Sequence, residues 1–228
     1  MIRLAALTLS VFAFALGAAS VNPELLQRLD NAASHFQSMS ATVTYLTHTD
    51  VIDENATETG DVLMKKVAPG EVQGLINFTA PNPRSVTFEK RNVQIYYPKI
   101  KTLQVYDLEE HGEQLDKFLM IGFGTSGIEL AKDYTMTVLD TEAVKGMPGQ
   151  AVHIELIPKS GAARRYVKKL ELWIPEHGDP YPSREKITEP SGDSRTMTYS
   201  NLKINPTLPP DALKLKLPSG VKTEHPGK

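Results

Sequence analysis

The sequence predicts a mainly β fold of the α+β type, in which an antiparallel sheet forms a sandwich or a barrel-like structure. From Ala41 onward, apolar residues recur with a period of two, as at Val43 and Tyr45, in short segments bounded by proline, glycine, asparagine or charged turns. Strands at such regular spacing are typical of consecutive antiparallel hairpins. One segment before them and one between them have helical spacing instead, so we expect the sheet to carry helices.

The first twenty residues have the pattern of a cleavable export signal. Arg3 supplies a positive charge, residues 4–16 are apolar or small, and cleavage is expected after Ala19 or Ser20. The apolar stretch is too short to span a bilayer comfortably. We therefore expect a signal peptide at 1–20, a single domain at 21–228 and a location in the bacterial periplasm. The chain contains no cysteine, which excludes a disulfide scaffold.

A helix is expected at the start of the mature domain. Asn22 can cap it, and Pro23 falls in the first turn, where a missing N–H is harmless. Apolar residues at spacings of four and three predict one buried face, formed by Leu25, Leu29, Ala32, Phe36 and Met39.

The expected strands and helices follow from where the period changes. Alternation predicts strands near residues 43–45, 72–78, 86–88, 93–97 and 103–105, and again at 134–139, 151–157, 167–174, 183–188 and 196–204. Leu115, Leu119 and Phe123 lie at four-residue spacing and predict a second helix, with a further helical turn at 128–132. The tail at 206–218 is rich in proline, with a brief alternating run at Leu213, Leu215 and Leu217.

Charge argues against nucleic acid as a partner. Lys and Arg number 25 and Asp and Glu 27, for a net charge of −2, so no global field attracts a polyanion. One basic cluster flanks the expected turn at 160–162, and it lacks the aromatic residues that stack on bases. We interpret it as a solvated hairpin, with a docking patch for a membrane protein or for lipid head groups as the alternative. It consists of Arg164, Arg165, Lys168 and Lys169.

No catalytic, cofactor or metal motif meets its structural requirements. Residues 122–127 match G-x-G-x-x-G, but a helical segment precedes them, so we interpret the glycines as a turn that ends a helix. Ser126 is not a nucleophile elbow, because Ile128 stands where that motif needs glycine. The six histidines form no metal-binding pair, and His153 is expected at the surface of a strand. We therefore expect a binding protein without catalytic residues, cofactor or metal.

The order of many short segments resembles the LolA family, periplasmic carriers of outer-membrane lipoproteins. The match rests on this order along nearly the whole mature chain rather than on one motif. The matching segments are the amphipathic first helix with residues 36–39 at its end, then 60–66, 78–84, 93–98, 170–174, 182–185 and 217–221.

The resemblance implies a curved antiparallel sheet that forms an unclosed β-barrel, with a helical lid over a lipid-binding cavity. It further implies a monomeric carrier that takes acylated lipoproteins or other lipids from an inner-membrane ABC transporter and delivers them to an outer-membrane acceptor. From the alternation of the strands and the spacing of the two expected helices, the residues expected to line the cavity are Phe36, Met64, Ile76, Phe78, Phe88, Ile95, Tyr97, Val105 and Leu119.

The chain departs from the family at the arginine that holds the lid closed. Lysines stand in the corresponding stretch, and alternation with Val62 and Met64 favours Lys66 over Lys65 as the inward lid latch. Lysine lacks the rigid fork of arginine. The alternative to a lid latch is that both lysines are solvated at a strand end. The alternatives to a lipoprotein carrier are a divergent lipid-binding or lipoprotein-sensing protein of the same fold, or a hydrolase whose site is not evident from sequence.

Overall fold

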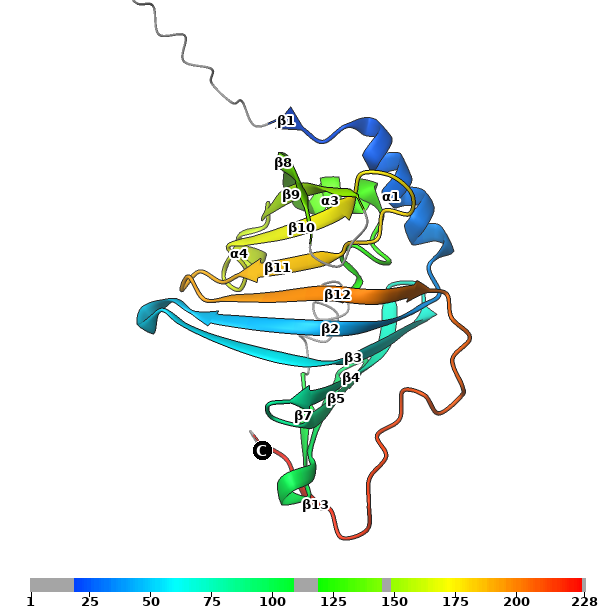
Figure 1. The fold of residues 1–228 in the computed structure, drawn as a ribbon, viewed down its shortest axis with the longest axis vertical. Helices are drawn as coiled ribbons and strands as arrows, with labels where there is room; N and C mark the ends of the chain where they lie inside the picture. Colours follow the sequence, from blue (N-terminus) through cyan, green and yellow to red (C-terminus); the bar gives the residue numbers. More distant parts are fainter. Residues whose placement is uncertain (1–18, 109–118, 145–148, 227–228) are drawn as a thin grey trace, which may run out of the picture.

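The protein is built on one curved, unclosed antiparallel sheet. The computed structural model describes residues 19–108, 119–144 and 149–226. In them, thirteen strands pair in the order β1-β8-β9-β10-β11-β12-β2-β3-β4-β5-β6-β7-β13. The edge strands β1 and β13 pair only with β8 and β7 among the described residues, so the sheet does not close on itself. The predicted fold class is confirmed (Figure 1).

Most predicted strands are present, and several are longer than the alternation indicated. The strands are β1 (Ala19–Ser20), β2 (Ser38–Thr49), β3 (Glu54–Ala68), β4 (Glu71–Ala80), β5 (Arg84–Glu89), β6 (Asn92–Tyr97), β7 (Thr102–Asp107), β8 (Tyr134–Ala143), β9 (Gln150–Pro158), β10 (Lys169–Pro175), β11 (Arg184–Thr188), β12 (Ser194–Ile204) and β13 (Lys222–Glu224). The described helices are α1 (Pro23–His35), α3 (Gly127–Asp133) and α4 (Gly161–Arg164), with short 3₁₀ turns η1 (Asp50–Ile52) and η2 (Pro98–Ile100).

Strand register places every second residue of a strand, usually an apolar one, on the face that the helices cover, here called the inner face. Met39 lies opposite Met64, and Val43 lies opposite both Gly60 and Tyr199. The same register continues through β4 and β5, where Ile76 pairs with Val86. The opposite face is called the outer face. Because the side-chain period of a strand is two, one register fixes both faces across the sheet.

The first helix ends earlier than its apolar spacing predicted. Asn22 caps α1 by accepting from the N–H of Glu24 at 2.9 Å, as expected, but α1 stops at His35. Phe36 is extended and Met39 lies in β2. Asn205 causes this break, since its Oδ1 accepts from the N–H of Gln37 at 2.7 Å and its Nδ2 donates to the His35 carbonyl at 2.9 Å. Both apolar residues still reach the inner face.

The glycine-rich segment is a turn, as predicted. The Met120 carbonyl accepts from the N–H groups of Phe123, Gly124 and Thr125. Ser126 then caps α3 in a capping box with Glu129, which confirms the predicted helical turn at 128–132. Residues 120–125 are called the lid turn below. Leu119 begins the described part of this segment, whereas Leu115 lies outside the described residues.

The inner face is covered in two halves. Leu25 and Leu29 of α1 pack with Ile154, Leu156 and other apolar residues of β9 and β10. Phe36 and the lid turn cover the half formed by β12, β2, β3, β4 and β5. The buried apolar residues of that second half, here called the inner cluster, are Phe36, Met39, Ala41, Val43, Val62, Met64, Val72, Ile76, Phe78, Phe88, Met120, Phe123, Tyr181 and Tyr199.

The C-terminal tail follows the outside of the sheet. After β12 it runs without helix or strand to β13, which pairs in parallel with β7 at the far end (Figure 1). The alternating run at Leu213, Leu215 and Leu217 is not a strand; these residues border a groove with outer-face residues of β3, β5 and β6. Within the described residues, no helix has the length and apolar character needed to cross a membrane.

Gly122 sets how closely the lid turn approaches the sheet. Its φ of +80° is left-handed, and an added Cβ would lie 2.6 Å from Cγ of Pro182. Gly122→Ala is therefore expected to lower the free energy of unfolding by about 2–3 kcal/mol. Gly178→Ala is the matched control, because φ is +79° there and the space around it is open. It should lose only about 1 kcal/mol in the same urea titration. Equal losses would show that the lid turn is not packed against Pro182.

Candidate functional site

The inner cluster is an apolar surface with an aromatic centre. The Phe123 ring of the lid turn stacks on Tyr181 at 6.1 Å between ring centroids and meets Tyr199 edge-on at 5.5 Å. Phe36 lies 6.0 Å from Phe123. Aromatic pairs in these geometries add to the free energy gained from area burial alone. The lid turn therefore closes the inner face by packing Phe123 against rings from three other parts of the chain.

Most residues predicted to line the cavity come together. Phe36, Met64, Ile76, Phe78 and Phe88 belong to the inner cluster, and Leu119 packs against it. Ile95 and Tyr97 are half-buried on the inner face of β6, opposite Val86 and Thr102 respectively.

Val105 differs from the other residues predicted to line the cavity. It lies opposite Gln94, whereas Gln104 lies opposite the inward Ile95. Val105 is therefore on the outer face. The brief alternation of Leu103 and Val105 could not reveal this, because Leu103 is also buried, but on the outer face.

A cleft of about 960 Å³ opens beside the inner cluster, between α1, α3 and the turn that joins β3 to β4. Buried Ala33, Met120 and Ile121 are among its apolar lining residues, and Met120 also belongs to the inner cluster. Charged residues of both signs line it as well: Asp30, Lys66, Glu71, Lys90, Arg91, Glu129, Lys132 and Asp133. Its volume is in the range of pockets that hold small-molecule ligands.

Lys66 occupies the position expected of an inward lysine. It lies opposite the fully buried Val72 of β4, and it lines the cleft together with Asp30 and Ser34 of α1. Among the described residues, its ammonium has no hydrogen bond or ion pair. The proposed role of Lys66 as a lid latch stays a prediction.

An ion pair on the inner face escaped the sequence analysis. Both terminal nitrogens of the Arg84 guanidinium donate to the Glu58 carboxylate, Nη2 at 2.8 Å, and the guanidinium lies 4.1 Å from the Phe78 ring centroid. The hydrogen bond to Glu58 raises the pKa of Arg84. Glu58 lies opposite Tyr45 and Arg84 opposite Phe78. Alternation could have placed each residue inward, but their separation of 26 positions hid the pair.

Glu185 is a second inward carboxyl group, and it lacks a basic partner. Strand register sets it between Leu172 of β10 and Met197 of β12. Tyr199 donates to its Oε2 at 3.1 Å, whereas its Oε1 is buried and has no hydrogen-bond partner among the described residues. Burial raises the pKa of Glu185 to about 8, against the opposing effect of the Tyr199 hydrogen bond. The group is therefore largely protonated at neutral pH.

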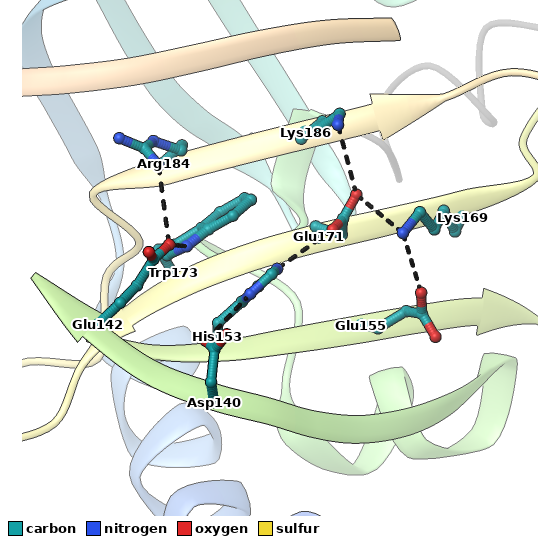
Figure 2. Close-up of polar contacts among 9 residues, drawn as sticks. All are labelled: Asp140, Glu142, His153, Glu155, Lys169, Glu171, Trp173, Arg184 and Lys186. Atoms are coloured by element: carbon teal, nitrogen blue, oxygen red, sulfur yellow. Dashed lines mark hydrogen bonds and ion pairs between the residues drawn. The ribbon is translucent and has the colours of Figure 1, made fainter. Parts of the chain in front are cut away.

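The outer face carries a polar cluster around His153, shown in Figure 2. The imidazole stacks on Trp173 at 4.1 Å between ring centroids, with Asp140 3.2 Å from its Nδ1 and Glu171 3.2 Å from its Nε2. His153 lies on the face opposite Ile154, as expected, but its side chain is only 12% exposed because it is stacked and hydrogen-bonded. The bulge in β8 between Val138 and Asp140 brings Asp140 opposite His153, which alternation alone cannot show.

This cluster is explained by ion pairing across β8, β9, β10 and β11. Glu171 also meets Lys169 at 3.3 Å and Lys186 at 4.0 Å, and Glu142 accepts from the indole N–H of Trp173 (Figure 2). Ligand atoms of Asp140, Glu142 and His153 lie within 4.8 Å of one another, close enough to converge on a metal ion. Each of these three groups nevertheless has a protein partner already, so the geometry requires no ion.

Comparison with known proteins identifies the fold. No protein-family model matches the chain, and no curated protein matches it significantly. An uncharacterized conserved protein from Thermus thermophilus superposes with a TM-score of 0.52 at 14% identity, over 89% of this chain and 97% of that one. MucB gives a TM-score of 0.50 at 16% identity over 85% of this chain and 62% of its own, less than two thirds. A LolA superfamily protein from Nitrosomonas europaea gives 0.40 at 14% identity, over 86% and 99%.

The likenesses to the Thermus thermophilus protein and to MucB show that this chain shares their fold. The chain has the architecture that the resemblance implied, an unclosed curved sheet with helices over its inner face. Identities of 16% or less show the fold alone. What the chain binds has to be argued from its own residues.

The pKa of Glu185 predicts how stability depends on pH. Because the pKa is raised from 4.5 to about 8 in the folded protein, the unfolded chain releases this proton first. The protonated Glu185 carboxyl group contributes fully to the free energy of unfolding below pH 4.5, and this contribution is lost as the pH rises through 8. Glu185→Gln should remove this loss, so the variant gains roughly 2–4 kcal/mol relative to wild type between about pH 5 and pH 8.5. Urea titrations of both proteins at the two pH values measure this difference in the free energy of unfolding. An equal change with pH in wild type and variant would contradict a buried neutral carboxyl group.

Proposed function

We propose that the protein binds acyl chains on its inner face and carries acylated lipoproteins, or other lipids, through an aqueous compartment. The observation that carries this proposal is the inner cluster, an apolar surface of a single sheet that is closed by the lid turn and Phe36 instead of a second sheet. A surface of this kind can exchange its cover for a ligand of the same chemistry. A sandwich core cannot do so without separating two sheets.

The energetics favour an apolar ligand of extended shape. Each CH₂ group removed from water contributes about 0.8 kcal/mol, so a long acyl chain gains about 10 kcal/mol from burial of a dozen groups. The adjoining cleft, with Ala33, Met120 and Ile121 among its lining, offers a path from solvent to the inner cluster. Its charged lining residues suit the polar head of a lipid or an attached polypeptide.

The carrier role goes beyond acyl binding and rests on the LolA-like fold together with the N-terminal sequence. Residues 1–20 have the pattern of an export signal, which favours the periplasm. In that compartment we propose loading from an inner-membrane ABC transporter and delivery to an outer-membrane acceptor, with the protein acting as a monomer and without catalysis. Mass spectrometry of lipids and lipoproteins that copurify with the protein tests the cargo directly.

Acyl binding should be sensitive to charge on one face of β5 and not on the other. Val86 packs against the inner cluster, whereas Thr87 beside it faces outward opposite Leu75 and Gln94. Val86→Asp should weaken binding of a fluorescent fatty acyl probe at least about tenfold, because the ligand would bury an unpaired charge. Thr87→Asp, the matched control, should bind as wild type does. The readout is a probe titration on protein whose fold is checked by circular dichroism.

Two outcomes of this experiment would count against the proposal. No binding of any acyl probe by the wild type would remove acyl chains as the ligand. Equal binding by wild type and a folded Val86→Asp variant would place the ligand elsewhere on the molecule.

Lys66 should affect release more than stability if it holds the cover closed. Lys66→Leu is expected to change the rate at which a bound lipoprotein passes to acceptor membranes, through a shift of at most about 1–2 kcal/mol between closed and open states. Lys65 is the control, since it lies opposite Ser38 and Gln73 and faces outward. Equal transfer rates for wild type, Lys65→Leu and Lys66→Leu would eliminate both lysines as latches.

A further inference from the structure

Glu185 is a polar group of the inner face that keeps an unsatisfied hydrogen-bonding atom in the described structure. Its Oε1 is buried and unpartnered among the described residues, and it lies under the lid turn, where a Cβ added to Gly122 would be 3.0 Å from it. The inward carboxylate of Glu58 differs, because Arg84 neutralises it with two hydrogen bonds. A buried polar atom without a partner is rare in folded proteins and calls for an explanation.

The hydrogen-bond pattern shows what this oxygen can offer. Tyr199 stands within hydrogen-bond reach of two acceptors, Oε2 of Glu185 at 3.1 Å and the thioether of Met197 at 3.4 Å. A thioether is the weaker acceptor, so the hydroxyl donates to Oε2. With a pKa of about 8, Glu185 holds its own proton at neutral pH. That proton then belongs on Oε1, and Glu185 presents an O–H donor toward the lid turn.

We propose that Glu185 donates a hydrogen bond to the ester or amide carbonyl oxygen of a bound acyl chain, and so fixes the position of the chain's head on the inner face. The inference rests on the proposed function and deepens it by naming a specificity-determining residue. A ligand that displaces the lid turn from Gly122 would bring its carbonyl to the vacated side of Oε1. The hydrocarbon then has apolar surface available on both sides of Glu185.

The surroundings of Glu185 favour a neutral acceptor over a charged one. The groups that face it are Leu172 of β10, Met197 and Tyr199 of β12, Pro182, and Gly122 of the lid turn. Tyr199 is the titratable member, and burial raises its pKa well above 10. Arg184 and Lys186 flank Glu185 in β11, but they pair with Trp173 and Glu171 on the outer face. No described cation is therefore available to neutralise an anionic head at this point.

The test compares two probes of equal chain length that differ only in the carbonyl: a long-chain methyl ester and the corresponding methyl alkyl ether. Competition with a fluorescent acyl probe gives both affinities at about pH 6.5 and pH 9.5. Wild type should prefer the ester about fivefold at the lower pH and lose the preference at the higher one, because ionised Glu185 cannot donate. Glu185→Leu should lack the preference at both pH values. Glu185→Gln should keep it at both, since an amide donates without titrating.

Thr87→Val is the matched control, because it removes a hydroxyl on the outer face of β5 and leaves the Glu185 donor. Its preference for the ester at the lower pH should persist. An equal preference for the ester in wild type and Glu185→Leu would overturn the inference while leaving acyl binding intact. If Glu185→Leu does not fold, the test uses Glu185→Gln alone. Loss of its preference for the ester over the ether at the higher pH would then overturn the inference. Binding of neither probe by wild type would instead overturn the proposed function and this inference with it.

The source of the carbonyl can be separated in the same assay. A diacylated lipopeptide and a diacyl phospholipid with the same chains both carry ester carbonyls. Weaker binding of either one to Glu185→Leu than to Glu185→Gln supports the inference and identifies that lipid as a ligand of the site. No difference between the two variants for both lipids would contradict it.

Discussion

The structure depends on one constraint: a single curved sheet has to bury an apolar face without a second sheet to pack on. Helix α1 covers one half and is held in place by hydrogen bonds from its middle and its C-terminal half. The Arg28 guanidinium donates to the carbonyls of Glu176 at 2.8 Å and Gly178 at 2.9 Å, and the Tyr181 hydroxyl donates to the Ala32 carbonyl at 3.1 Å. The other half is closed by rings of Phe36 and Phe123. Because short separate segments cover this surface instead of a second sheet, a ligand can replace one of them without disrupting the rest of the fold.

Polar groups on the two faces have different roles, and their partners show the difference. On the outer face, His153, Glu171 and Trp173 form a network that crosses four strands and stabilises the β8–β11 half of the sheet. On the inner face, Glu58 is paired with Arg84, whereas Glu185 keeps a buried oxygen without a partner among the described residues. The role of the paired groups is to stabilise the fold. The unpaired one is the group whose chemistry a ligand can complete.

Alternation and spacing were enough to predict a mainly β antiparallel sheet, most of its strands and much of the inner face, because inward residues of a one-layer sheet are apolar over long runs. The unclosed barrel with its lid was implied only by the family resemblance. They failed where a distant residue intervenes. Asn205 ends α1 at His35, 170 positions away, and a bulge in β8 turns Asp140 toward His153. Val105 was misplaced because apolar residues such as Leu103 and Tyr96 are also buried on the outer face of β6 and β7, so apolar character does not mark the inner side there. Alternation with Ile187 sets Glu185 on the inner face, but only three-dimensional packing shows its Oε1 under Gly122.

The contacts of the cover also indicate where it can open. Within the described residues, the lid turn makes backbone hydrogen bonds only to itself, through the Met120 carbonyl, and touches the sheet by apolar and aromatic packing. Helix α1 is tied by side-chain hydrogen bonds to three different segments, so it is the fixed part. Apolar contacts have no fixed direction, and an acyl chain can replace them at little loss. Opening at the lid turn would uncover Glu185 and join the inner cluster to the cleft at Met120, which places the polar anchor and the entrance at the same end of the bound chain.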